Sequence, residues 1–116
     1  MSDCLFCKII KKEIPAEVVY SNNVVTAFKD INPQAPTHIL IIPNKHVADI
    51  HELSSENDCG EIMAAITKGI KEITDCEGID ESGFRVVTNK GTEAGQTVFH
   101  LHFHILGGRE FRWPPG

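Results

Sequence analysis

Residues 95–106 read Gly95-Gln96-Thr97-Val98-Phe99-His100-Leu101-His102-Phe103-His104-Ile105-Leu106, and this stretch holds three of the six histidines of the chain. The histidines alternate with large apolar residues, and side chains of a β-strand alternate between the two faces of a sheet. The pattern therefore predicts a strand over 100–106 that turns Leu101, Phe103 and Ile105 toward the core. The three imidazoles would line the other face at intervals of about 6.5–7 Å, as one wall of a pocket.

Such a row of histidines has two chemical uses. Alternate histidines on a strand can both reach one metal ion. A neutral imidazole is also a good nucleophile near pH 7, because its ordinary pKa is about 6.5. In a third interpretation, the rings have no function beyond forming hydrogen bonds on the face of an ordinary strand. This interpretation is the least favoured, since a supporting strand gains nothing from three titratable rings in a row.

The composition is typical of one soluble globular domain. The 116 residues are 41% hydrophobic and 23% charged, which suits a single core, so we expect one domain over 1–116. The net charge of −5 argues against a nucleic-acid binder with a broad basic surface. No segment approaches the roughly 20 apolar residues of a membrane span, and the start lacks a signal-peptide pattern. We expect a cytoplasmic protein without a membrane partner; the nucleus stays open, although no basic localisation run is present.

Apolar periodicity predicts two helices and five strands in this chain. A short amphipathic helix over 4–12 ends before Pro15, and a long helix begins near Ser54 or Ser55 and ends with Gly78 as its stop. The predicted strands cover 18–20, 24–29, 37–42, 84–88 and 100–106, of which 37–42 is apolar almost throughout and hence central. Short connections favour antiparallel pairing. The predicted fold class is α+β, an antiparallel five-stranded sheet with one long and one short helix.

Five motifs give the chain a family resemblance. They are Phe28-Lys29-Asp30-Ile31-Asn32-Pro33-Gln34-Ala35-Pro36-Thr37-His38, Ile42-Pro43-Asn44-Lys45-His46, Gly95-Gln96-Thr97-Val98, His100-Leu101-His102-Phe103-His104-Ile105-Leu106 and Trp113-Pro114-Pro115-Gly116. Together they resemble the histidine triad superfamily and its histidine triad fold. The closing Trp-Pro-Pro-Gly resembles the nucleotide-binding Hint branch, which is protein kinase C inhibitor-like. The resemblance covers the chain from about residue 4 to its last residue.

The resemblance implies an enzyme that hydrolyses purine nucleoside phosphoramidates and releases AMP or GMP from an amine. His102 would attack the α-phosphorus and form a covalent nucleotidyl-histidine, which water then cleaves. His100 and His104 would flank the nucleophile, and His38 would join them from another strand. Thr97 matches a position that is commonly Ser in the family and assists the leaving group. Catalysis of this kind requires no cofactor.

The same resemblance implies which residues bind the nucleotide. Asp30 would accept hydrogen bonds from the ribose hydroxyls. Asn89 and the backbone N–H groups that begin with Gly95 and Gln96 would meet the phosphate, and Gly95 permits close approach. The base pocket would have five apolar walls, each of which could equally serve the core: Leu5, Phe6, Ile9, Phe28 and Ile31.

A homodimer is a further implication of the resemblance, with the two sheets joined edge to edge. The C-terminal segment 107–116 would reach the site of the partner. Trp113 would then form a wall of the leaving-group pocket, which gives a purpose to a chain end made of a tryptophan and two prolines.

Cys4 and Cys7 are spaced C-x-x-C, and with distant histidines they form a zinc-type donor set. Some members of the resembled family with this spacing bind zinc through the two cysteines and the histidines that match His46 and His100. Such a zinc would be structural, because protein donors fill all four positions. The alternative is a pair of partly buried thiols on a short helix. A zinc-activated water on the triad is disfavoured, because no Asp or Glu lies close to the triad in sequence.

Three functions are in contention on the sequence alone. The leading hypothesis is the phosphoramidate hydrolase. The second is a nucleotide-binding regulatory or scaffold protein with little catalysis, and the third is a dinucleoside polyphosphate hydrolase. The Trp-Pro-Pro-Gly ending argues against this third function and also against a nucleotidyl transferase, another activity of the superfamily. The sequence leaves open the physiological substrate, its leaving amine, the choice between adenine and guanine, and any protein partners.

Overall fold

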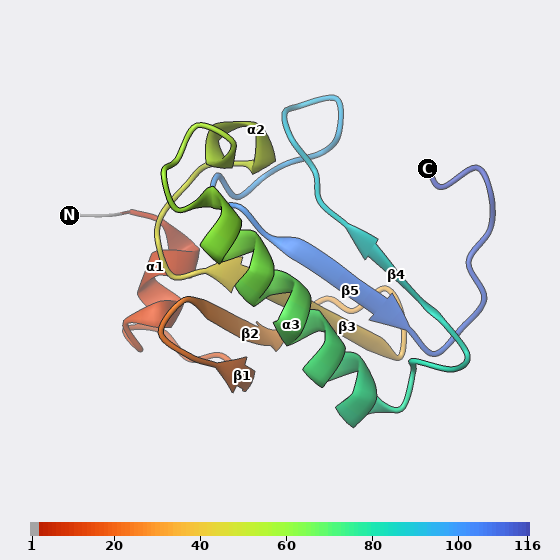
Figure 1. Ribbon diagram of the computed structural model, residues 1–116. Helices are drawn as coiled ribbons and strands as arrows, with labels where there is room; N and C mark the ends of the chain where they lie inside the picture. The colour runs from red at the N-terminus through yellow and green to blue at the C-terminus, as the bar shows by residue number, and fades with distance from the viewer. Residues whose placement is uncertain (1–2) are drawn as a thin grey trace.

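The computed structural model describes residues 3–116, so the first two positions of the predicted 1–116 domain lie outside the described residues. Its centre is one antiparallel sheet (Figure 1). The strands are β1 (Val18–Ser21), β2 (Val25–Lys29), β3 (Thr37–Pro43), β4 (Phe84–Val87) and β5 (Phe103–Gly107), in the spatial order β1-β2-β3-β5-β4. The helices are α1 (Leu5–Ile10), α2 (Ile50–Leu53) and α3 (Cys59–Glu77). The predicted α+β class and five-stranded antiparallel sheet are confirmed.

Strand β3 is buried along its whole length, as predicted for the central strand, because the two faces of the sheet are covered by different helices. Its residues Ile39 and Ile41 belong to the core under α3, together with Ile62, Ile66 and Ile73 of that helix. The alternate residues of β3 pack on the other face, in a smaller cluster that includes residues of α1. In Figure 1, α3 runs across the front of the sheet and α1 stands at one end of it. Among the described residues, no helix is long and apolar enough to span a membrane.

The histidine row, residues 100–106, follows the same alternation between the two faces of the sheet. Leu101, Phe103 and Ile105 are buried in the core under α3, which confirms the predicted inward side of the row. Successive side chains of a strand point to opposite faces, so His104 on β5 and His38 on β3 turn away from α3. The long helix therefore builds the core on one face, and the histidines occupy the face on which α1 lies.

The predicted strand over 100–106 is wrong at its start, because β5 begins only at Phe103. Continuing the register of β3 and β5 past Phe103 puts Pro43 opposite Leu101. Proline has no N–H group with which to continue the ladder. The Leu101 N–H instead donates to the Val47 carbonyl at 2.7 Å. The first two histidines of the row thus lie on extended chain just outside the sheet.

The predicted start of the long helix is also wrong. Ser54 is the C-cap of α2, a helix that the prediction of one long and one short helix omits, and α3 starts after Asp58. The start signal of α2 is present in the sequence: the Asp49 side chain accepts from the Glu52 N–H at 2.8 Å, a capping arrangement. The predicted end of the long helix is confirmed, because Gly78 adopts the left-handed φ of 71° as its C-cap.

Helix α3 comes closest to the sheet at Gly69. A Cβ atom at this position would lie 2.5 Å from Ile41 Cδ1 and 3.2 Å from Tyr20 Cε2. Ile41 is wholly buried between the helix and the sheet, so its methyl group has little room to move aside. The missing side chain is what permits this helix–sheet distance.

We predict that Gly69→Ala lowers the free energy of unfolding by about 1–2 kcal/mol, because overpacking outweighs the gain of about 1 kcal/mol in helix propensity. Gly60→Ala is the matched control in the same helix, since nothing lies within 4 Å of a Cβ there. The control should raise the free energy of unfolding by up to about 1 kcal/mol. Urea denaturation of the three proteins measures both effects. A Gly69→Ala variant as stable as the Gly60→Ala variant would contradict the close approach of α3.

Candidate active site and metal centre

The middle histidine of the row, His102, has a fixed tautomer. Its ring is buried, and Nδ1 lies 2.7 Å from the His100 carbonyl oxygen. A carbonyl oxygen only accepts, so Nδ1 carries the proton and Nε2 of the neutral ring keeps its lone pair. The His102 carbonyl accepts in turn from Thr88 Oγ1 at 2.8 Å, and the Phe6 ring stands edge-on to the His102 ring with 5.1 Å between centroids. The site therefore presents one nitrogen lone pair in a fixed orientation.

The third histidine of the row, His104, contacts a histidine of the neighbouring strand. His104 Nδ1 lies 2.8 Å from His38 Nε2, and Asp30 Oδ2 lies 3.4 Å from the same His38 nitrogen. Burial lowers the pKa of His104 to about 4, and the nearby His102 and His38 act in the same direction. Burial also lowers the pKa of His38, against the opposing effect of the Asp30 charge. Both rings are therefore neutral at pH 7, so each has one donor and one acceptor nitrogen for the hydrogen bond between them.

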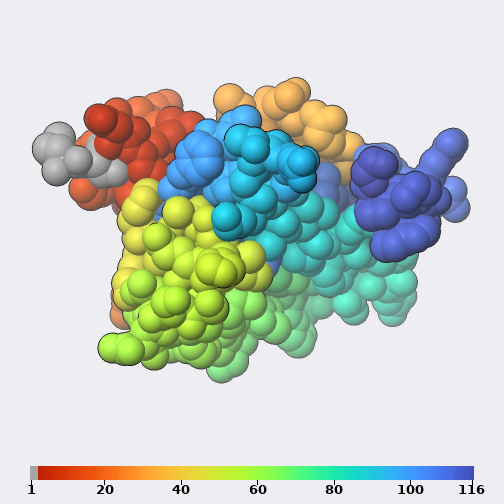
Figure 2. All heavy atoms as spheres, turned by 90° about the horizontal axis from the view of Figure 1, so that it is seen from above, coloured from red at the N-terminus to blue at the C-terminus, as the bar shows by residue number. Residues whose placement is uncertain are grey.

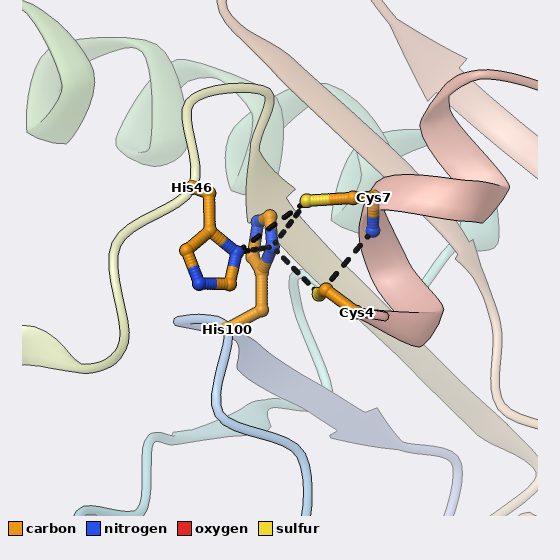
Figure 3. Close-up of side chains that lie close together, drawn as sticks. All are labelled: Cys4, Cys7, His46 and His100. Carbon is orange, nitrogen blue, oxygen red and sulfur yellow. Dashed lines mark hydrogen bonds between the residues drawn. The ribbon is translucent and has the colours of Figure 1, made fainter. Parts of the chain in front are cut away.

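The first histidine of the row, His100, belongs to a second cluster (Figure 3). Its Nε2 donates to the Pro43 carbonyl at 2.8 Å, so its Nδ1 keeps a lone pair. That nitrogen lies 3.3 Å from Cys4 Sγ, 3.6 Å from Cys7 Sγ and 3.1 Å from His46 Nδ1. Cys7 Sγ lies 3.4 Å from His46 Nδ1, and all four donor atoms lie within 4.8 Å of one another. The predicted donor set is thus gathered in one place.

The separations in this cluster fit a tetrahedral zinc ion. Zinc bonds of about 2.0–2.1 Å to nitrogen and about 2.3 Å to sulfur put the donors about 3.3–3.8 Å apart. The observed contacts run from 3.1 Å to 3.6 Å. Burial lowers the pKa of His100 to about 4, so the ring is neutral, and its other nitrogen already bonds to the Pro43 carbonyl, as metal-bound histidines usually do. The donors present therefore suit a structural zinc.

The five predicted walls of the base pocket fall into two groups. Phe6, Ile9 and Phe28 are buried in one cluster, where the Phe6 and Phe28 rings lie 5.4 Å apart between centroids. Leu5 is 47% exposed and Ile31 is 100% exposed, so the core-packing alternative is wrong for these two residues. Their apolar side chains stand at the surface on segments that flank the buried cluster.

The loop between β4 and the histidine row is organised by Gln96. This side chain is buried, and it accepts from the Gly91 N–H and donates to the Ala48 carbonyl, both at 2.9 Å. The backbone N–H groups of Gly95 and Gln96 donate to the carbonyls of Thr92 and Gly91 at 3.0 Å. In this structure Gly95 and Gln96 therefore shape the loop, and the amides nearer to His100 are the candidates for holding a phosphate.

The other predicted residues lie in three different parts of the chain. Thr97 is exposed and, together with Leu5 and His46, lines a groove of about 570 Å³. Asn89 is half-buried at the start of the same loop. Trp113 is 81% exposed beside Arg85 of β4, with 6.0 Å between the guanidinium and the indole. In Figure 2 the C-terminal segment (dark blue), to which Trp113 belongs, and the N-terminal helix (red) lie at opposite ends of the molecule.

Three groups that position the histidines were missed by the sequence analysis. They are the Pro43 carbonyl, the Thr88 hydroxyl and the backbone N–H of Gln34, which donates to His38 Nδ1 at 3.0 Å. Two of the three are main-chain groups, which a pattern of side chains does not reveal. Thr88 comes at the end of a predicted strand, and nothing in the sequence distinguishes it from other strand threonines.

The lowered pKa of His104 predicts a loss of stability in acid. The pKa of a histidine in an unfolded chain is about 6.5, whereas burial lowers the pKa of His104 in the folded protein to about 4. Between these two pH values the unfolded chain therefore binds more protons than the folded protein. The free energy of unfolding should therefore fall as the pH drops from about 6.5 toward about 4. Urea denaturation at about pH 7.5 and about pH 5 measures this fall, which should be smaller for His104→Gln. An equal fall in the variant would contradict the neutral, buried state of His104.

Comparison with known proteins supplies the family. The HIT domain matches residues 11–111 of this chain. A purine nucleoside phosphoramidase of Escherichia coli K12 is 44% identical over 107 residues, which cover 92% of this chain and 88% of that protein. A HIT-like protein of Synechocystis is 48% identical over 114 residues, which cover 98% and 97% of the two chains. The crystal structure of a HIT family hydrolase from Legionella pneumophila has 49% identity and a TM-score of 0.93, and the match covers 98% of this chain and 100% of that one. The resemblance to the histidine triad proteins is confirmed, and this chain belongs to the HIT domain family.

Proposed function

We propose that this protein is a purine nucleoside phosphoramidate hydrolase, which releases AMP or GMP from an amine. The observation that carries the proposal is the buried His102, whose Nδ1–H is held by the His100 carbonyl at 2.7 Å. The remaining ring nitrogen, Nε2, has the lone pair that a nucleophile needs. The 44% identity to the E. coli purine nucleoside phosphoramidase supports this substrate class, and the Legionella HIT family hydrolase supports hydrolysis more broadly.

In the proposed first step, His102 Nε2 attacks the α-phosphorus, and an N–P bond forms as the bond from phosphorus to the amine nitrogen breaks. The electron pair of the broken bond stays on the amine, which needs a proton in order to leave. The exposed Thr97 hydroxyl is the proposed donor. The nucleotidyl-histidine carries a positive charge on its ring, and the His100 carbonyl at Nδ1 stabilises that charge.

In the second step, water attacks the phosphorus and the N–P bond breaks. The electron pair returns to His102 Nε2, and a nucleoside monophosphate leaves. The proton that the water loses replaces the one that Thr97 passed to the amine, so both side chains end as they began. One hard displacement is thereby split into two easier ones.

The proposed nucleotide contacts follow the residues of the sequence analysis except at Gly95 and Gln96, whose N–H groups donate within the loop. Asp30 would accept from the ribose hydroxyls; its Oδ1 already accepts from the Asn32 N–H at 2.8 Å, which orients the carboxylate. Asn89 and the amides between Gln96 and His102 would meet the phosphate. The base would lie against the apolar group at α1 and β2, namely Leu5, Phe6, Ile9, Phe28 and Ile31.

We also propose a homodimer that extends the sheet through β4. Strand β4 is the outermost strand of the sheet on the side of β5, and an outer strand edge is a ready template for pairing. The C-terminal segment lies along this strand, where Arg85 donates to the Arg112 carbonyl at 2.9 Å. A dimer through this edge would bring the exposed Trp113 toward the site of the partner.

A structural zinc ion is the proposed occupant of the Cys4, Cys7, His46 and His100 cluster. Bound there, zinc would supply a cross-link and no chemistry of the reaction. The two cysteines belong to the first turn of α1, where Cys4 is the N-cap and accepts from the Cys7 N–H at 3.4 Å. The cross-link would therefore hold α1 against the histidine row.

Replacement of the nucleophile tests the reaction. With an adenosine phosphoramidate as substrate, we expect the wild type to release AMP and His102→Ala to lose activity by a factor on the order of 10³ or more. The control is His51→Ala, an exposed histidine of α2, which should retain activity. Mass spectrometry of the quenched wild-type reaction should find one nucleotidyl group on His102.

Other outcomes of the same assay would contradict the proposal. Activity that persists in His102→Ala would refute the assigned nucleophile. AMP binding without turnover in the wild type would favour the regulatory or scaffold protein. Cleavage of a dinucleoside polyphosphate in preference to the phosphoramidate would favour the third function.

Metal analysis tests the zinc proposal without reference to activity. Protein purified without added zinc should contain about one zinc ion per chain, because four protein donors fill a tetrahedral site. Cys4→Ser and Cys7→Ser should each lose most of the metal. Cys59→Ser, a change at a half-buried cysteine of α3, is the matched control and should keep it. A wild type with a zinc content near zero rejects the site.

A further inference from the structure

The three arginines of the chain lie either on β4 or on the segment that follows β5, at Arg85, Arg109 and Arg112. Figure 1 shows this C-terminal segment (dark blue) running back beside β4. Among residues 3–116, none of the three guanidinium groups forms an ion pair with a carboxylate. Two of them, those of Arg85 and Arg109, instead contact aromatic rings and main-chain carbonyls.

These two guanidinium groups and two aromatic rings form a continuous series of contacts. Arg109 Cζ lies 4.3 Å from the centroid of the Phe111 ring, and Arg85 Cζ lies 5.2 Å from the same centroid. Arg85 Cζ also lies 6.0 Å from the centroid of the Trp113 ring. A cation is attracted to the face of an aromatic ring out to about 6 Å. We call Arg109, Phe111, Arg85 and Trp113 the arginine–aromatic stack.

The two arginines of the stack also donate to main-chain carbonyls. Arg85 Nη2 donates to the Arg112 carbonyl at 2.9 Å. Arg109 Nε donates to the Gln34 carbonyl at 3.1 Å, and its Nη1 donates to the Glu110 carbonyl at 2.9 Å. A planar guanidinium can bond to a carbonyl in its own plane while its face packs on a ring, which a lysine ammonium cannot do. The stack therefore ties the C-terminal segment to β4 and to the loop before β3.

The stack holds Trp113 without burying it. The side chain of Trp113 is 81% exposed, so its ring is available to a group from outside the chain. Ordering a chain end costs conformational entropy, and the contacts of the stack offset that cost before any ligand binds. A ring that is already fixed loses less entropy on meeting a ligand than a mobile ring does. The C-terminal segment thus presents a preorganised aromatic ring.

We propose that Arg85 is a positioning residue, which fixes Trp113 so that its ring selects the amine of the substrate in the site of a partner subunit. The selection rests on the proposed function and on the proposed dimer through β4, the strand to which Arg85 belongs. The hold of the stack on Trp113 is a property of the single chain without ligand.

The alternative is that Arg85 and Arg109 form a binding site for an anion. Three of their N–H groups already donate to carbonyls of the chain itself. Both guanidinium groups also lie over the Phe111 ring. This arrangement suits a role in holding the C-terminal segment. In the alternative only the positive charge would matter, and Arg85→Lys would behave as the wild type.

Trp113 is the one tryptophan of the chain, so its fluorescence reports on the stack directly. Time-resolved anisotropy of the full-length protein without ligand measures the fast local motion of this ring. We expect little such motion in the wild type, and a decay dominated by fast motion in Arg85→Gln, Arg85→Lys and Phe111→Leu. The last variant breaks the stack without a change in β4. Glu110→Gln, at an exposed position of the same segment, is the matched control and should behave as the wild type.

The second measurement is the selectivity between two adenosine phosphoramidates, one of an arylalkylamine and one of ammonia. We expect the three stack variants to lose about 3-fold to 10-fold in kcat/KM for the arylalkylamine compound, the size of effect that lost aromatic contacts give. The loss should lie mainly in KM, because the ring contacts a part of the substrate that does not react. The ammonia compound has no substituent to meet Trp113, so its kcat/KM should stay the same in every variant.

Four results would count against these expectations. A Trp113 ring that moves freely in the wild type overturns the proposal, as does an Arg85→Lys variant that matches the wild type in both measurements. Unchanged selectivity in variants whose Trp113 has become mobile overturns the positioning role. A wild type that fixes Trp113 and hydrolyses neither compound refutes the proposed function and upholds the stack. If Arg85→Gln does not fold or does not dimerise, Phe111→Leu decides, because it lies outside β4.

Discussion

The hydrogen bond from His102 Nδ1 to the His100 carbonyl, 2.7 Å long, is the contact on which the rest of the site depends. It can form only because this carbonyl is not used by the sheet. Residue 100 precedes β5, which begins at Phe103, and the neighbouring strand β4 ends at Val87 opposite His104, so no strand partner takes up this carbonyl. The end of the sheet thus releases main-chain groups at the place where the imidazoles need partners.

Helix α1 makes the histidine row and the cysteine cluster one unit. Its Phe6 ring lies edge-on to both His102 and His100, at 5.1 Å and 5.9 Å between centroids. Cys4 and Cys7 stand at its first turn, and their sulfur atoms lie beside His100 Nδ1. Any shift of α1 would therefore move the apolar wall at His102 and the donors around His100 together. Helix α3, on the opposite face, takes no part in this linkage and serves the core.

Side-chain periodicity predicted the faces of the molecule well, because burial acts on side chains. The inward set of the histidine row, the central strand over 37–42 and the stop at Gly78 all follow from the residues themselves. The end of the ladder, the Pro43 carbonyl and the Gln34 N–H depend on where backbone groups find partners, and residue types report that only indirectly. Helix α2 is a different case, since its Asp49-x-x-Glu52 signal was available, but the serines that follow it are equally good caps by type.

The polarity of the main-chain group that each ring meets accounts for three unlike histidines in one row. The Pro43 carbonyl accepts from Nε2 of His100, which leaves Nδ1 unprotonated and close to the two sulfur atoms. The His100 carbonyl accepts from Nδ1 of His102, which leaves Nε2 with the lone pair that a nucleophile needs. His104 meets no main-chain group of this kind; its Nδ1 contacts Nε2 of His38, a ring that itself accepts from the Gln34 N–H. Identical side chains in an alternating pattern thus have different surroundings, because the backbone offers carbonyls to two of the rings and only an indirect N–H to the third.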